Sequence, residues 1–127
     1  MKKTYLNEFH SAHNGNLVDF SGWEMPINYG SQINEHNEVR NNVGIFDVSH
    51  MAVFDFLGGN QVEFLRKLLP NDVNKILSAK RALYSPLLNE NGRILDDLIV
   101  YHIGNNNFRI ISNCATRQQN KLWFNEN

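Results

Sequence analysis

The sequence predicts an α+β fold, in which an antiparallel sheet with packed helices forms a ferredoxin-like unit. Two observations lead to this prediction. In the second half of the chain, apolar residues follow the order strand, helix, antiparallel strands and a final helix. Turns rich in asparagine and glycine separate the extended segments, which favours antiparallel neighbours. With 127 residues, 42% of them hydrophobic, the chain suits one domain, or one domain and a piece of a second.

The first half of the chain is expected to hold short elements separated by turns. Asn14-Gly15 and Ser21-Gly22 are turn signals, and Pro26 favours an extended residue before it. Ser31 is suited to cap a helix because its hydroxyl can accept a bond from a backbone N–H of the first turn. The expected elements are a short helix with Leu6, Phe9 and His13, an extended segment over 17–23, and a polar surface helix over 32–42 that Gly44 stops.

The second half is expected to be more regular. Residues 45–57 carry apolar side chains on both faces, which indicates a largely buried strand. Asn60 with Glu63 three residues later resembles a capping box for the next helix. The expected elements are a helix over 61–69 ended by Pro70, a strand over 82–88, a hairpin turn at 89–92, a strand over 94–101, a turn at 104–107, a strand over 108–112, and a helix from Ala115 to the C-terminus.

Composition limits the classes of function and location. The chain has 12 basic and 13 acidic residues, so its charge gives no reason to expect a nucleic-acid partner. No apolar run approaches the roughly 20 residues of a membrane span, and the N-terminus has neither a secretory signal nor a transit-peptide pattern. A single cysteine, Cys114, excludes an internal disulfide. We therefore expect a cytoplasmic protein, or a mitochondrial matrix protein if the source is eukaryotic.

The generic catalytic and metal-binding patterns are weak. Asp47, Ser49 and His50 are close in sequence, but triad members usually come from separate segments, so ordinary polar roles are favoured. His36 and His50 have no metal-ligand spacing, so no metal is expected. Cys114 is interpreted as a small buried thiol.

Two adjacent acids, Asp96 and Asp97, stand out within an otherwise apolar strand. Alternation puts Asp96 on one face with Leu98 and Asp97 on the other with Tyr101. A carboxylate on a buried face is costly unless it is hydrogen-bonded or faces a cavity. The residues alone leave structural and functional roles equally open for both acids.

Four stretches together resemble the N-terminal region of aminomethyltransferases, the T-proteins of the glycine cleavage system. They are VDFSGWEMPINYGSQINEHNEVRNNVGIFDVSHM (18–51), LLPNDV (68–73), ALYSPLLNENGRILDDLIVY (82–101) and ISNCATR (111–117). The resemblance implies a transferase that passes the aminomethyl carbon carried on the lipoyl arm of the H-protein to tetrahydrofolate. Ammonia is released and methylene-tetrahydrofolate is formed.

The resemblance also implies a set of site residues. The family's catalytic acid is matched to Asp96, which is expected to face the folate cavity and orient the reacting groups. Asp97 is then left as its structural partner. Asp96→Asn is accordingly expected to reduce turnover with the fold intact, and Asp97→Asn to act on stability. The folate pocket is carried over to Met51, Tyr84, Tyr101 and Asn113, together with Asp96.

Family members are about three times as long, so 1–127 is interpreted as the N-terminal part of their folate-binding region. We expect such a chain to bind folate weakly and not to turn over alone. Two other classes stay open: the folate domain of a sarcosine- or dimethylglycine-oxidising protein, and a folate-binding accessory protein of iron–sulfur cluster assembly. The aspartate pair and the absence of a cysteine motif disfavour the second of these.

Overall fold

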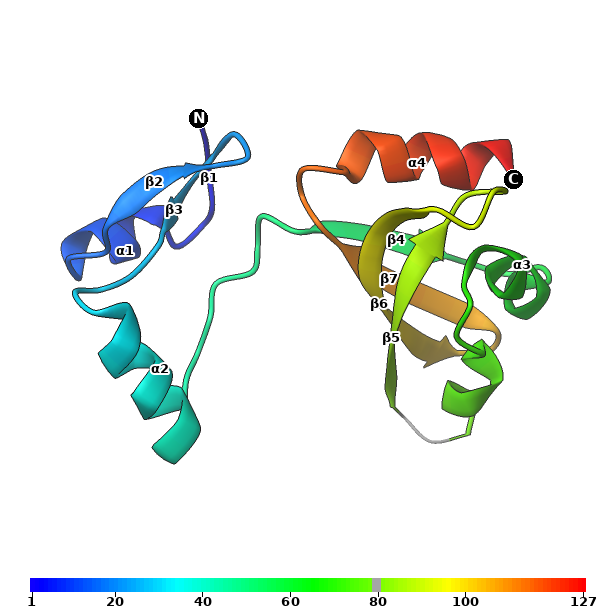
Figure 1. Ribbon diagram of the computed structural model, residues 1–127, viewed down its shortest axis with the longest axis horizontal. Coiled ribbons are helices and arrows are strands. Elements are labelled where there is room, and N and C mark those ends of the chain that lie inside the picture. Colours follow the sequence, from blue (N-terminus) through cyan, green and yellow to red (C-terminus); the bar gives the residue numbers. More distant parts are fainter. Residues whose placement is uncertain (79–80) are drawn as a thin grey trace. The chain divides into compact units, whose positions relative to one another are not determined.

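The computed structural model describes residues 1–78 and 81–127 (Figure 1). The chain divides into two compact units, Met1–His50 and Met51–Asn127. The predicted α+β class, with antiparallel strands and packed helices, is confirmed. No helix in the described part of the chain is long and apolar enough to cross a membrane.

The N-terminal unit is built on a small three-stranded sheet in the order β1-β3-β2. β2 and β3 form an antiparallel hairpin, and its turn residues Ser21 and Gly22 both have positive φ. β1 runs parallel to β3 and was not predicted, because its two lysines give no strand pattern. The elements are β1 (Lys2–Lys3), α1 (Asn7–Ala12), β2 (Leu17–Phe20), β3 (Trp23–Pro26) and α2 (Gln32–Asn41).

Helix α2 confirms the predicted polar helix to within a residue. Its first turn is capped by Ser31, whose Oγ accepts a hydrogen bond of 3.3 Å from the backbone N–H of Asn34. None of its residues is buried. The stretch 45–57 was predicted as one strand, but only Ala52–Phe56 forms a strand, β4. The first part of that prediction is wrong because Asp47 starts a local turn, accepting the backbone N–H of Ser49 at 2.9 Å.

The C-terminal unit contains a four-stranded antiparallel sheet in the order β4-β7-β6-β5. β4 and β6 both run antiparallel to β7, so they are parallel to each other on its two sides. α3 leads from β4 to β5, which lies at the opposite edge of the sheet and runs antiparallel to β4. The elements are β4 (Ala52–Phe56), α3 (Gln61–Leu68), a 3₁₀ turn η1 (Val73–Ile76), β5 (Ala82–Leu88), β6 (Ile94–Gly104), β7 (Asn107–Ser112) and α4 (Arg117–Glu126).

The turns of this unit follow the predictions, but one cap differs. Asn89 closes the β5–β6 hairpin by accepting the backbone N–H groups of Asn91 and Arg93 on its Oδ1. The expected capping box is wrong in detail: the side chain of Asn60 bonds the Glu63 carboxylate and does not cap the backbone of α3.

The core of the C-terminal unit lies on one face of the sheet. Helices α3 and α4 both contribute to it, so both helices cover this face, here called the helix face. The opposite face is called the outer face. The buried core consists of Leu65, Leu68, Leu69, Val73, Ile76, Leu87, Leu98, Val100, Phe108 and Ile110, with Trp123 and Phe124 of α4 packed against it.

Candidate functional site

The two neighbouring acids of β6 lie on opposite faces of the sheet, as predicted. Asp96 shares the helix face with Leu98 and Val100, all of them buried. Asp97 is exposed on the outer face, as is Tyr101. This alternation fixes which acid meets the core and which meets solvent.

Asp96 is a buried carboxylate with a full set of hydrogen-bond donors. Its side chain accepts bonds from Asn113 Nδ2 at 2.7 Å, Thr116 Oγ1 at 2.6 Å and Asn120 Nδ2 at 2.5 Å. The backbone N–H of Asp97 adds a fourth bond at 2.9 Å. Burial raises the pKa of Asp96, but these bonds stabilise the carboxylate more strongly and bring the pKa below its ordinary value. Asp96 is therefore held as an anion that ties β6 to the start of α4.

The structure places Asp96 and the two predicted pocket tyrosines on opposite faces of the sheet. The sequence put it in the same cavity as the tyrosines, but Tyr84 and Tyr101 lie on the outer face and Asp96 lies on the helix face. The physical reason is the odd spacing between Asp96 and Tyr101, which puts them on opposite sides of one strand. The role of Asp96 as the reacting acid stays a prediction.

The outer face instead gathers its polar groups around Asp97. Tyr84 donates its hydroxyl to Oδ2 of Asp97 at 3.2 Å, and Asn113 donates from Nδ2 to Oδ1 at 3.2 Å. The hydrogen bond to Asp97 raises the pKa of Tyr84, so this tyrosine stays protonated and remains a donor. Two side chains, from β5 and the end of β7, thus converge on the one exposed carboxylate of β6.

The other residues predicted for the pocket are Met51 and Tyr101. Tyr84 and Tyr101 are 62% and 39% exposed, so both rings are accessible to a ligand. Met51 directly precedes Ala52, which pairs with Ser112, so Met51 and Asn113 lie at the same end of the sheet. The Met51 carbonyl accepts a bond of 3.1 Å from Arg117 Nη2.

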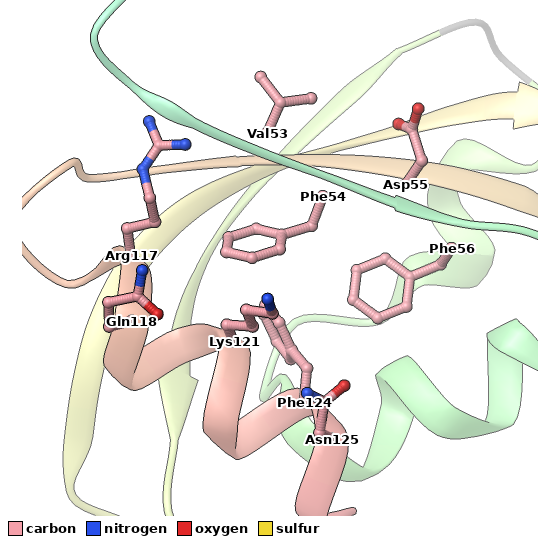
Figure 2. Close-up of a pocket in the computed structure, with 9 residues that line it drawn as sticks. All are labelled: Val53, Phe54, Asp55, Phe56, Arg117, Gln118, Lys121, Phe124 and Asn125. Carbon is pink, nitrogen blue, oxygen red and sulfur yellow. The ribbon is translucent and has the colours of Figure 1, made fainter.

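A groove of about 470 Å³ lies elsewhere, between β4 and α4 (Figure 2). Phe54, Phe56 and Phe124 line it, and it contains none of the predicted site residues. Val53 and Asp55, from the other side of β4, also line it, but no residue of the Asp97 group does.

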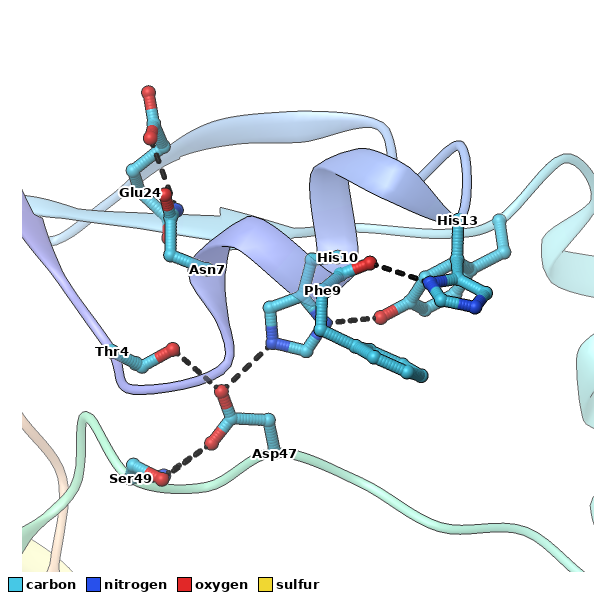
Figure 3. A network of polar contacts seen from close by, with 9 residues as sticks. Thr4, Asn7, Phe9, His10, His13, Glu24, Asp47 and Ser49 are labelled. Carbon is cyan, nitrogen blue, oxygen red and sulfur yellow. Dashed lines mark hydrogen bonds and ion pairs between the residues drawn. The ribbon is translucent and has the colours of Figure 1, made fainter.

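A second polar cluster lies in the N-terminal unit around Asp47 (Figure 3). Oδ2 of Asp47 accepts bonds from Thr4 Oγ1 at 2.7 Å and from the ring of His10 at 2.8 Å. The other ring nitrogen of His10 lies 2.5 Å from the Tyr29 hydroxyl. Burial raises the pKa of Asp47, but its hydrogen bonds lower this pKa by more than burial raises it. The pKa of Asp47 therefore lies well below its ordinary value. The cluster anchors the segment around Asp47 to α1.

This arrangement is not that of a nucleophile triad. Ser49 donates its hydroxyl directly to Oδ1 of Asp47 at 2.6 Å, with no histidine between them. The ring of His50 packs edge-on against Phe20, with centroids 5.4 Å apart. A triad requires the histidine to bridge the hydroxyl and the acid, so the ordinary polar interpretation of these residues fits the structure. Among residues 1–78 and 81–127, no three His, Cys, Asp or Glu side chains gather as metal ligands would.

Sequence reasoning missed Ser112, Thr116 and Asn120, which complete the network of Asp96. Asn120 and Ser112 are fully buried, and Asn120 Nδ2 also bonds Ser112 Oγ at 3.0 Å. Thr116 and Asn120 are spaced i, i+4, so they lie on one side of α4. The sequence signal for this network was a pair of polar residues at i, i+4 spacing on the side of the helix that packs against the sheet.

The comparisons with known proteins agree with one another. A family model described as the GCVT N-terminal domain matches residues 6–127. An aminomethyltransferase from Xylella fastidiosa strain M23 is 54% identical over 125 residues, which are 98% of this chain and 34% of that protein. One from Legionella pneumophila strain Corby is 53% identical over 121 residues, 95% of this chain and 34% of that protein.

A solved structure gives the same picture. The crystal structure of glycine cleavage system aminomethyltransferase T from Bartonella henselae has a TM-score of 0.87 and 34% identity, and the match covers 98% of this chain and 35% of that one. The chain thus spans about a third of the length of the curated relatives it matches.

Proposed function

Because the chain belongs to the GCVT N-terminal domain family, we propose that it is the N-terminal, folate-binding region of an aminomethyltransferase. The activity proposed is that of the glycine cleavage system. The one-carbon unit of the aminomethyl-lipoyl H-protein passes to tetrahydrofolate, ammonia leaves, and methylene-tetrahydrofolate forms. The similarity to aminomethyltransferases over nearly the whole chain supports this proposal. A cytoplasmic location is proposed with it.

The observation that carries the proposal is the exposed group on the outer face. Tyr84 and Tyr101 offer aromatic surface on which a flat pterin ring can stack. Asn113 offers both a donor and an acceptor for the amide-like edge of that ring. Met51 lies at the same end of the sheet as Asn113 and suits an apolar wall.

We assign the ligand-facing acid to Asp97. Its carboxylate is on the same face as both tyrosines, where it can orient the folate and stabilise positive charge on the transferred carbon. Asp96, whose four hydrogen bonds already occupy its oxygens, is proposed to support the site by holding Asn113. The sequence resemblance assigned the reacting acid to Asp96, so this proposal exchanges the two roles.

The 127-residue chain itself is proposed to bind tetrahydrofolate weakly without turnover. The relatives named as enzymes are about three times as long, so any part of the site that their other regions supply is absent from these 127 residues. Without those walls, water is not excluded from the outer face, and electrostatic stabilisation of a transition state is weak.

Isothermal titration calorimetry with tetrahydrofolate tests the assignment. We expect Asp97→Asn to abolish measurable binding, and Asp55→Asn, a matched change of an exposed outer-face acid, to leave the affinity unchanged. Ammonia release from aminomethylated H-protein is the second readout, and none is expected from this chain alone. Unchanged affinity in Asp97→Asn, together with lost affinity in a well-folded Asp96→Asn, would return the ligand-facing role to Asp96.

A further inference from the structure

Two carboxylates fix the orientation of the Asn113 amide. Its Nδ2 lies 2.7 Å from Oδ1 of Asp96 and 3.2 Å from Oδ1 of Asp97. The amide nitrogen carries two hydrogens, so one is available for each acid. A half-turn of the amide would instead bring its oxygen against two carboxylates, which repel it. The oxygen of the Asn113 amide, a hydrogen-bond acceptor, is therefore the group that this side chain leaves for a ligand.

How firmly Asp96 orients Asn113 depends on the other oxygen of the same carboxylate. Oδ2 of Asp96 accepts bonds from Thr116 Oγ1 at 2.6 Å and from Asn120 Nδ2 at 2.5 Å. The torsion that turns a carboxylate about its Cβ–Cγ bond is broad, so hydrogen bonds on both oxygens are needed to fix it. Thr116 and Asn120 thus determine where Oδ1 of Asp96 points.

Thr116 occupies the N-cap position of α4 but does not cap this helix. A hydroxyl at that position usually accepts a hydrogen bond from a backbone N–H of the first turn, as the Ser31 hydroxyl does in α2. The Thr116 hydroxyl accepts no such bond. It donates to Asp96 and also lies 3.2 Å from the backbone carbonyl oxygen of Asn113. A residue that departs from a local rule in this way is often one whose side chain serves a site.

We propose that Thr116 is a positioning residue for the Asp97 group, which consists of Tyr84, Asp97 and Asn113. Its hydroxyl fixes the Asp96 carboxylate, and Asp96 in turn holds the Asn113 amide with its oxygen free for the ligand. This inference rests on the proposed binding of tetrahydrofolate. It adds a specificity to that function, because the Asp97 carboxylate and the Asn113 carbonyl accept hydrogen bonds from a ligand and donate none.

Such a group distinguishes the oxidation states of a pterin ring. The reduced pyrazine ring of tetrahydrofolate carries N–H groups at N5 and N8, and either of them can donate to Asp97 or Asn113. Folic acid has bare nitrogen atoms at both positions, so acceptors of the protein would meet acceptors of the ligand. We therefore expect the chain to bind tetrahydrofolate more tightly than folic acid, by about tenfold or more.

Nuclear magnetic resonance titrations of the 127-residue chain with tetrahydrofolate and with folic acid test the role of Thr116. Thr116→Val keeps the size of the side chain and removes the hydroxyl, whereas Thr116→Ser keeps the hydroxyl. We expect Thr116→Val to weaken tetrahydrofolate binding by about tenfold. It should also bring the two affinities closer together, because the released Asn113 amide can turn its N–H groups toward folic acid. Thr116→Ser should keep both affinities.

Thr4→Val is the matched control. Thr4 Oγ1 also donates to a carboxylate, that of Asp47 at 2.7 Å, but in the other unit of the chain. This variant should lose stability and keep both affinities. General loss of stability acts on the two ligands alike, so the ratio of their affinities reports the orientation of Asn113. An unchanged ratio in Thr116→Val overturns the proposal, as does equal binding of the two ligands by the original chain.

A second readout needs no ligand and decides even if Thr116→Val does not fold. In the original chain, the two Nδ2 protons of Asn113 should exchange with water more slowly than those of the exposed Asn106, because carboxylates engage both. Equal exchange in the two residues overturns the proposal. If the original chain binds neither ligand, the proposed function fails. Slow exchange at Asn113 that becomes fast in Thr116→Val would then still support the positioning of Asn113 by Thr116.

Discussion

One amide group connects the two acids of β6: Asn113 Nδ2 lies 2.7 Å from Oδ1 of Asp96 and 3.2 Å from Oδ1 of Asp97. Asn113 follows β7, at the end of the sheet where the backbone passes from one face to the start of α4. The buried acid and the exposed acid therefore share a donor. We therefore expect a substitution at Asp96 to alter the position of Asn113.

Asp96→Asn is expected to destabilise the chain by about 3 kcal/mol, because it removes a charged acceptor from buried donors. Thr116 and Asn120 would lose their charged partner within the core-facing network. Urea unfolding followed by far-UV circular dichroism measures the change. Glu63→Gln, on the exposed side of α3, is the control and should shift the free energy of unfolding by under about 0.5 kcal/mol. A well-folded Asp96→Asn of unchanged stability would contradict this prediction.

Asp97→Asn is expected to have the opposite profile. The side chain is exposed, so the free energy of unfolding should change by under about 0.5 kcal/mol. Tetrahydrofolate affinity should be lost, and Tyr84→Phe should weaken it less because it removes only the hydroxyl that bonds Asp97. Calorimetric titration of both variants, with thermal melts, checks this. This result would assign ligand binding to Asp97 and stability to Asp96, which is the opposite of what the sequence predicts. A large loss of stability in Asp97→Asn would instead support the assignment made from the sequence.

Acid should destabilise both units through their buried carboxylates. The folded-state pKa values of Asp47 and Asp96 lie below the ordinary value of 3.8. A carboxyl with a lowered folded pKa stabilises the fold above its unfolded pKa and loses that contribution as the pH falls through the folded pKa. We therefore expect the free energy of unfolding to fall below about pH 4. Urea unfolding between neutral and acidic pH measures this.

The control for this pH dependence is the double variant Asp47→Asn with Asp96→Asn. It is less stable at neutral pH, but its stability should decline less steeply in acid because neither carboxyl is left to titrate. An acid slope equal to that of the original chain would show that other groups cause it.

His10→Leu is expected to cost about 2 kcal/mol, since it leaves Asp47 and the Tyr29 hydroxyl without their common partner. The imidazole is 3% exposed, so water does not readily replace it. His36→Leu on the exposed polar helix α2 is the matched control and should be nearly neutral. Chemical unfolding followed by the fluorescence of Trp23, in a Trp123→Phe background, reports on this unit. Equal effects of the two substitutions would contradict a structural role for the Asp47 cluster.

The sequence predicted the regular half of the chain better than the site. Periodicity identified α3 and the strands of the meander, and asparagine-glycine signals identified their turns, because these features are local. The two faces of β6 were also predicted, since alternation needs only the backbone. The face that the helices cover was not predictable, because it depends on how α3 and α4 cross the sheet. For this reason the residues alone did not decide between Asp96 and Asp97 as the acid that faces a ligand.

Two other differences have the same origin in non-local contacts. The stretch before β4 has a strand-like composition, yet the bonds of Asp47 to Thr4 and His10 fix it as an irregular segment. The short strand β1 exists only because β3 provides a partner for Lys2 and Lys3. In both cases a residue distant in sequence decides the local conformation, as tertiary context often does.

The bonds of Asp96 also bear on how the C-terminal unit opens. They join β6, the end of β7 and the first turns of α4, so these segments cannot separate without exposing a buried anion. In hydrogen–deuterium exchange, the amides of β6, β7 and α4 should therefore exchange together as one cooperative block. The turns at the sheet ends, which have no such anchor, should exchange earlier. One ionised side chain thus separates the turns, which open locally, from β6, β7 and α4, which open only when the whole unit unfolds.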